Sequence, residues 1–270
     1  GGTSGANNVG AINIAGGQTG TFSNNVAATT ITIGTSTTDG TMIIASAASP
    51  AAITVRGAIN GSSANTGNLT VQNSGGTTFT GIIGGTRINA LTISQATTFQ
   101  AAVSATTLST TAAISNGTTL NISSTSSIGA NITTTGAQTY TGATTLTADS
   151  SLTAGSSTIS FGNTVNGAQS LTFTGSGTVT FTGAVGSGTA LGTITNNASI
   201  IASPKCSGSA FSFTPTFSTT TGVTYAWKRP SQYGISTAAN QQSVPNISEA
   251  LNDTLITKVD VYYFYTLKMM

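Results

Sequence analysis

The sequence contains almost no charged residues. Of its 270 residues, seven are Lys or Arg and five are Asp or Glu, so charge makes up 4% of the chain, against about 25% in soluble globular domains. A surface that binds nucleic acid needs many Lys and Arg side chains to neutralise phosphates. This chain cannot supply such a patch, and we expect no nucleic acid among its partners.

Histidine is absent, and cysteine occurs once. Without histidine, Ser–His–Asp and Cys–His catalytic arrangements are excluded. A lone Cys206 excludes an intrachain disulfide and a multi-cysteine metal site, and we interpret it as a small buried apolar residue. Glu249 and Asp253 are the only close carboxylates, and we expect this pair in a solvated loop or strand edge rather than in a glycosidase site. We therefore predict a protein that is not an enzyme and has no catalytic, cofactor-binding or metal-binding residues.

Other common signatures are also missing. No apolar run approaches the 18 or more residues of a membrane-spanning helix. The chain opens on Gly1 with no Met or signal peptide, so we expect a trimmed piece of a longer protein. Gly84-Gly85 and Gly186-Ser187-Gly188 lack the strand–helix context of a phosphate loop and are interpreted as turn glycines. Asp-rich calcium repeats are missing too.

What the chain does contain is alternation of apolar and small polar residues. Abundant Ser, Thr, Gly and Asn suggest disorder as an alternative, but disordered chains are usually charged, whereas this one is 37% hydrophobic. Triplets with two apolar residues around one polar residue recur between Gly, Asn and Ser punctuation, which is typical of short strands. They include Ile31-Thr32-Ile33, Ile53-Thr54-Val55, Leu91-Thr92-Ile93, Leu120-Asn121-Ile122 and Val179-Thr180-Phe181. The pattern predicts an all-β fold.

The sequence repeats itself at two levels. Asn68–Gly81 aligns without gaps on Ser170–Gly183, with eight identities in fourteen positions. An aromatic residue is also followed, four positions later, by a small or branched residue. From Phe79 these aromatics recur at steps of about 20 residues, a spacing typical of repeat architectures. Leu120 fills one vacant position, and Phe22 and Met42 fit the same step. The aromatic positions are 22, 79, 99, 140, 161 and 181.

A period of about 20 residues suits one coil of a right-handed β-solenoid, in which each coil hydrogen-bonds to the next. We predict about ten coils and a rod of about 50 Å, at about 4.8 Å per coil. The aromatics would form one internal ladder, and Thr, Ser and Asn would form outer ladders. Stacked like charges would repel at this spacing, which explains the missing charge.

The composition changes near position 200. Residues 1–200 carry four charges and residues 201–270 carry eight, and Trp227 also lies in the second range. We therefore predict a solenoid over residues 1–201 and a second domain over residues 202–270, with a linker near Ser203-Pro204. A Trp on a middle strand of a small all-β unit suggests an immunoglobulin-like sandwich. The last strand, Val259–Leu267, is either central to that sandwich or contacts the solenoid or a neighbouring chain by its outer face or edge.

Residues from about Pro204 to Leu267 resemble the PKD-like modules of large Bacteroidetes surface proteins. The resemblance lies in Cys206-Ser207-Gly208, Phe213-Thr214-Pro215, Thr224–Arg229, Gly234-Ile235-Ser236, Ile247–Thr254 and Val259–Leu267. It implies an Ig/PKD-like β-sandwich that serves as a spacer or end module in secreted adhesins. Lys258-Val259-Asp260 departs from the apolar pattern of these modules. The region before position 201 resembles, in composition and period, the repeat regions of filamentous-haemagglutinin-type adhesins.

Three functions are compatible with these features. The first is a structural stalk or filament segment of an extracellular bacterial surface adhesin, whose partners are other copies, other segments of a longer surface protein, or surface glycans. The second is a self-polymerising filament subunit joined through β-edge pairing. The third is an ice- or carbohydrate-binding face of Thr rows, for which Thr172/Thr174 and Thr178/Thr180/Thr182 are the candidates.

Overall fold

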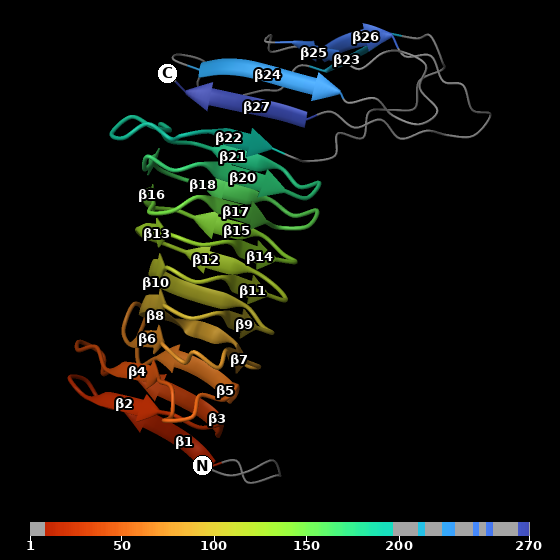
Figure 1. Cartoon of the computed structure of the whole chain (residues 1–270). Coiled ribbons are helices and arrows are strands. Elements are labelled where there is room, and N and C mark those ends of the chain that lie inside the picture. The colour runs from red at the N-terminus through yellow and green to blue at the C-terminus, as the bar shows by residue number, and fades with distance from the viewer. Residues whose placement is uncertain are drawn as a thin grey trace.

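The computed structural model describes residues 9–196 in full and, beyond them, the backbone of strands at 210–213, 223–229, 240–242, 247–250 and 264–269. All regular structure in these ranges is β-strand, which confirms the predicted all-β class. Residues 9–196 wind into a column of stacked coils from β1 to β22 (Figure 1). The fold over these residues is therefore a β-solenoid, as predicted.

The solenoid has three faces, which we call A, B and C. Each coil contributes one strand to each face, and the strands within a face run parallel. Face A contains β2 (Thr19–Phe22), β4 (Thr41–Ile44), β6 (Asn68–Val71), the ends of β8 (Ile83–Ile93) and β10 (Val103–Thr110), β13 (Ser126–Ile128), β16 (Thr144–Leu146) and β19 (Val165–Asn166). Face B contains the starts of β3 (Val26–Ile33) and β5 (Ile53–Gly61), then β7 (Thr77–Phe79), β9 (Thr97–Phe99), β11 (Ile114–Asn116), β14 (Ile132–Thr134), β17 (Ser150–Thr153), β20 (Leu171–Thr174) and β22 (Ile194–Asn196). Face C contains β1 (Val9–Ile14), the ends of β3 and β5, the starts of β8 and β10, then β12 (Leu120–Ile122), β15 (Gln138–Tyr140), β18 (Ile159–Phe161) and β21 (Val179–Phe181).

The solenoid has about nine coils, close to the ten predicted, but their lengths differ. Residues opposite each other on neighbouring coils are 17 positions apart at Phe99 and Asn116 and 29 apart at Val26 and Val55. From β11 to β17 the strands begin at positions 114, 120, 126, 132, 138, 144 and 150. Three such steps complete one coil, which is why Leu120 lies opposite Gln138. The period seen in the sequence is thus an average over coils whose connecting turns vary.

The core is a continuous apolar interior made from the first and third residues of most strands. Ile31, Leu69, Leu91, Ile122 and Leu171 are among the side chains with no exposed surface. Alternation places these residues inside and their Thr, Ser or Asn neighbours outside, as expected for strands with one buried face. Burial of the apolar column is the main driving force for stacking the coils.

The aromatic residues form two stacks and not the single ladder predicted. Phe79 and Phe99 stack on face B, with ring centroids 5.2 Å apart. Phe161 stacks between Tyr140 and Phe181 on face C, with both centroid distances at 5.1 Å. Aromatic rings stacked in this way gain stability beyond the area that they bury.

Three register predictions for this ladder were therefore wrong. Phe99 lies opposite Asn116 on the next coil of face B, while Leu120 lies between Val103 and Gln138 on face C. The two coils after Phe99 are shorter than the average period, so position 140 falls one strand further round the coil. On face A, Phe22 lies opposite Ile44, and Met42 lies opposite Gly20.

The two kinds of repeat found in the sequence do not correspond to a whole coil. Each corresponds to a strand together with the corner that leads to the next strand, which we call a strand–corner unit. Asn68–Gly81 holds β6 on face A and β7 on face B, whereas Ser170–Gly183 holds β20 on face B and β21 on face C. The four-residue step from an aromatic to a branched residue crosses a corner: Phe99 ends β9 and Val103 begins β10. All three corners use this unit, which is why distant segments look alike.

The C-terminal strands continue face B beyond the solenoid. β27 (Phe264–Met269) pairs antiparallel with β22, β24 (Val223–Arg229) pairs with β27, and β25 (Asn240–Gln242) pairs with β24. β23 (Ala210–Phe213) and β26 (Ile247–Ala250) form a separate antiparallel pair. Thus β27 lies between two strands, and one of its edges contacts the solenoid. The boundary predicted between residues 201 and 202 lies outside the described residues, and the Ig/PKD-like sandwich stays a prediction.

Candidate functional site

Most of the charged residues in the described solenoid hold coils together. Asp39 accepts hydrogen bonds from Gly67 N and Asn89 Nδ2, both at 2.7 Å, so one carboxylate joins two later coils. Asp149 accepts one from Ser170 N at 2.7 Å. Arg87 Nη1 donates to the Ala105 carbonyl oxygen at 3.0 Å. Three of the four charged side chains in residues 9–196 therefore have a structural role.

The residues singled out for chemistry in the sequence lie mainly in the C-terminal part. Cys206 and Asp253 fall outside the described residues, and Glu249 lies on β26, where only the backbone is described. Among the described residues, no three His, Cys, Asp or Glu side chains gather to form a metal site. The described part also contains no helix that could cross a membrane.

Face B carries an uninterrupted column of hydroxyl side chains over seven coils. Each member lies opposite the next in the parallel register, and its side chain is half-buried or exposed. The column consists of Thr54, Thr78, Thr98, Ser115, Thr133, Thr153 and Thr174. Thr153 and Thr174 are hydrogen-bonded to each other through their hydroxyls. The strand spacing of about 4.8 Å gives the column a regular repeat along the solenoid axis.

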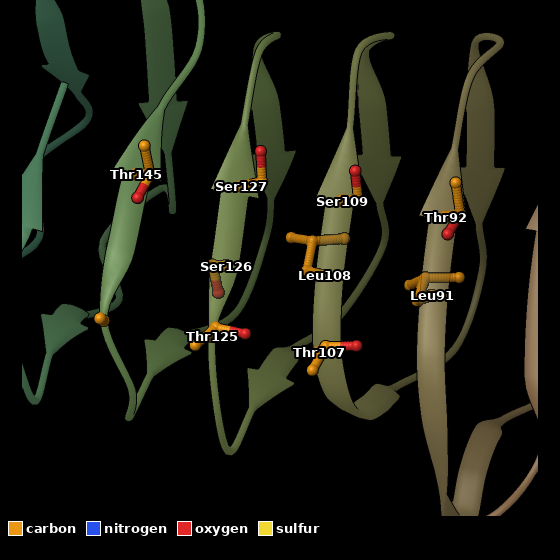
Figure 2. A pocket seen from close by; sticks show the side chains of 10 residues that line it. Leu91, Thr92, Thr107, Leu108, Ser109, Thr125, Ser126, Ser127 and Thr145 are labelled. Atoms are coloured by element: carbon orange, nitrogen blue, oxygen red, sulfur yellow. The ribbon is translucent and has the colours of Figure 1, made fainter. Parts of the chain in front are cut away.

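Face A carries a shallow groove beside a row of four hydroxyl residues. Figure 2 shows Thr92, Ser109, Ser127 and Thr145 at matching positions on four neighbouring strands. Thr107, Thr125 and Ala143 line the other side, and the groove has a volume of about 550 Å³. Leu91 and Leu108, which are both buried, also line the groove.

The candidate threonines from the sequence lie on more than one face. Thr172 and Thr174 belong to β20 on face B, where Thr174 ends the seven-residue column. Thr180 lies on face C, opposite Ser160, and Thr178 and Thr182 flank its strand. They do not form one surface. Thr78, Thr98, Ser115 and Thr133 are the middle residues of three-residue strands, and their common face depends on the coil lengths.

The interior is not wholly apolar. Gln138 Nε2 donates to the Thr153 carbonyl oxygen at 2.7 Å, and the Tyr140 hydroxyl donates to Gln138 Oε1 at 2.9 Å. Both residues have no exposed surface. Burial raises the pKa of the Tyr140 hydroxyl, because the ionised form would lose its hydration. This cluster supports the core and is not open to a ligand.

Exposed Thr and Ser hydroxyls can donate and accept hydrogen bonds, but they remain neutral at ordinary pH. Such a surface offers many weak, regularly spaced contacts to a neutral polar partner. It offers no general acid, general base or metal ligand. Comparison of the chain with protein-family models, with curated proteins and with solved structures found no match to any of them.

Proposed function

We propose that this chain is a structural stalk or filament segment of a secreted bacterial cell-surface adhesin, and that it performs no catalysis. The observation that carries the proposal is the solenoid of about nine coils, joined by parallel strand pairing from β1 to β22. The resemblance of residues 204–267 to PKD-like modules supports an extracellular location and an Ig/PKD-like sandwich as end module. The right-handed coil predicted from the sequence is part of this proposal.

A stalk works by keeping its length and direction. Nine coils at about 4.8 Å give a rod of about 43 Å. Each coil is joined to the next by three strands and by side chains such as Asp39, so bending requires several hydrogen bonds to break together. In such a protein the ligand-binding part lies elsewhere in the assembled adhesin.

Small-angle X-ray scattering of the purified chain tests the rod. We expect a pair-distance distribution with the long tail of an elongated particle, and rods in negative-stain images. A compact globular particle would contradict the proposal. Display of the segment in a bacterial surface protein, with the distance of a terminal tag from the cell surface as readout, tests its role as spacer. Deleting the β11–β16 coils should shorten that distance.

The hydroxyl column of face B favours a second candidate function, binding of a neutral polar surface such as a glycan or ice. Thr98→Tyr with Thr133→Tyr places two bulky rings on the column. Thr139→Tyr is the matched control, since Thr139 is the central residue of an equivalent strand on face C. Loss of binding to insoluble polysaccharide, or of thermal hysteresis, in the face B variant alone would support this function. An unmodified chain without either activity would dismiss it.

Self-polymerisation by β-edge pairing is the third candidate. The pairing of β27 with β22 weighs against it for the intact chain, because it occupies one edge to which another protomer could add. Light scattering at high protein concentration separates a monomer from a growing filament. A monomer is expected if the edge stays covered.

A further inference from the structure

Both ends of the solenoid leave apolar core residues incompletely covered. Six hydrophobic residues pack against the core while remaining partly exposed, and five of them belong to the first or last coil. Ile12 and Phe22 lie at the N-terminal end, and Val179, Phe181 and Val185 lie at the C-terminal end. In the middle of the column such residues are buried by the next coil. The two ends therefore have the composition of coil-to-coil contacts.

The strand direction changes at the C-terminal end of the solenoid. In the solenoid every pair of stacked strands is parallel, and β22 follows β20 in that way. β27 breaks the rule: it pairs antiparallel with β22, with Thr195 opposite Thr266 and Ile194 opposite Leu267 (Figure 1). A further coil cannot occupy the same edge of β22 while β27 is there.

We propose that β27 is a stop strand, which prevents the first coil of a second copy of this chain from adding to the C-terminal end of the solenoid. The inference concerns assembly and goes beyond the role of the stalk. The second copy is the natural occupant because its first strand on face B, the start of β3, begins with a buried apolar residue, as β22 does. These residues are Val26 in β3 and Ile194 in β22. The described parts of the two end coils, 9–33 and 171–196, carry no charge that would repel another copy.

The C-terminal strands also move the open edge away from the column. Beyond β27 lie β24 and then β25, which has three residues. A short edge strand is a poor template for pairing with another chain. The edge of β22 is thereby replaced by that of β24, and β25 pairs with Trp227–Arg229 of this seven-residue strand. Without β27, end-to-end addition would repeat the parallel pairing and apolar contacts that already join the coils.

Removal of residues 264–270 tests the proposal in the otherwise complete chain. We expect the truncated chain to form oligomers whose size grows with protein concentration, measured by size-exclusion chromatography with light scattering, while the complete chain stays monomeric. Circular dichroism and limited proteolysis show whether the solenoid is still folded. A folded truncated chain that stays monomeric at every concentration would overturn the proposal, and so would a complete chain that polymerises equally.

A disulfide lock tests the same contact without truncation. Thr195→Cys with Thr266→Cys, in a Cys206→Ser background, places two cysteines on directly opposed residues, within the Cα separation that a disulfide bridges. Thr195→Cys with Lys268→Cys is the control pair, displaced by two positions along β27. We expect efficient crosslinking only in the first pair. In low urea, which weakens the pairing of β27 with β22, oligomers should form only after the disulfide of the first pair is reduced. Equal crosslinking in both pairs, or equal assembly of the locked and reduced chains, would refute the stop strand.

Discussion

The Tyr140 hydroxyl donates a hydrogen bond to Gln138 Oε1, two residues earlier on the same strand, at 2.9 Å. Both side chains point into the solenoid and are fully buried. Gln138 in turn bonds the Thr153 carbonyl of the next coil at 2.7 Å. The pair therefore joins face C to face B inside the core, in coils that have no aromatic residue on face B.

Tyr140→Phe should lower the free energy of unfolding by about 1–3 kcal/mol, since it leaves Gln138 Oε1 buried without its donor. Thr139→Val is the control, because it changes a residue of the same strand that points outward; its effect should stay within about 0.5 kcal/mol. Urea unfolding followed by circular dichroism measures both. Equal effects of the two substitutions would show that the buried hydrogen bond adds no stability.

The same hydroxyl predicts a pH dependence. Burial raises the pKa of Tyr140 in the folded chain, whereas an unfolded tyrosine ionises near a pH of about 10. The folded state thus favours the protonated form, so this contribution is complete below about pH 10 and is lost as the pH rises above it. We expect unfolding stability above this pH to fall more steeply in the unmodified chain than in Tyr140→Phe. Parallel profiles would contradict the assignment.

Phe161 is fully buried and stacked on both sides by aromatic rings. Phe161→Ala should destabilise the fold by about 3–5 kcal/mol, because it opens a cavity and removes both stacking contacts. Phe181→Ala, at the partly exposed end of the same stack, should cost less. Thermal or urea unfolding gives the order, and a larger effect at Phe181 would contradict the described burial.

Two glycines have nearly the same backbone angle but different surroundings. Comparing their substitution by alanine therefore distinguishes the cost of backbone strain from the cost of a steric clash. Gly84 has φ of +73° and Gly17 has φ of +74°. A Cβ atom on Gly84 would lie 1.9 Å from the Ser104 carbonyl oxygen, while one on Gly17 would have no atom within 4 Å. Gly17→Ala should cost about 1–2 kcal/mol from the left-handed backbone alone. Gly84→Ala should cost more, since the next coil must move. Equal unfolding midpoints would disprove the close approach.

The scarcity of charge can be tested on face B, where Ser115 and Thr133 are opposite each other and exposed. Glutamate at both positions should destabilise the fold by about 0.2–1 kcal/mol beyond the sum of the single variants. Ser115→Lys combined with Thr133→Glu should show coupling of the opposite sign, because unlike charges then face each other. Added salt should weaken both couplings. A double-mutant cycle without coupling at low salt would contradict the explanation that repulsion between stacked like charges keeps charged residues scarce.

Much of the architecture could be predicted because it depends on local alternation. Triplets such as Ile53-Thr54-Val55 have one inward and one outward face whatever surrounds them, and they are strands in the structure. The average repeat of about 20 residues indicated stacked coils. The absence of catalytic residues was also predicted from composition, and it stays a prediction.

The position of each strand around the coil could not be predicted. Every strand–corner unit has a similar short pattern, so shortening two successive coils moves a strand to the next face without changing its sequence. Phe99 and Tyr140 are on different faces for this reason. The hydroxyl column of face B was missed as a unit because its members become neighbours only after all coil lengths are known.

The pairing of the last strand was likewise open. Alternation in the sequence predicted a strand near the C-terminus, but a central place in a sandwich and an edge contact with the solenoid were both compatible with it. In the structure, one edge of β27 pairs with the solenoid: β27 runs antiparallel along β22 and continues face B. By itself, the sequence determined a repetitive β-chain with few charges, whose apolar residues face inward. Only the tertiary structure decided which coils oppose each other, because register depends on the summed lengths of all preceding turns.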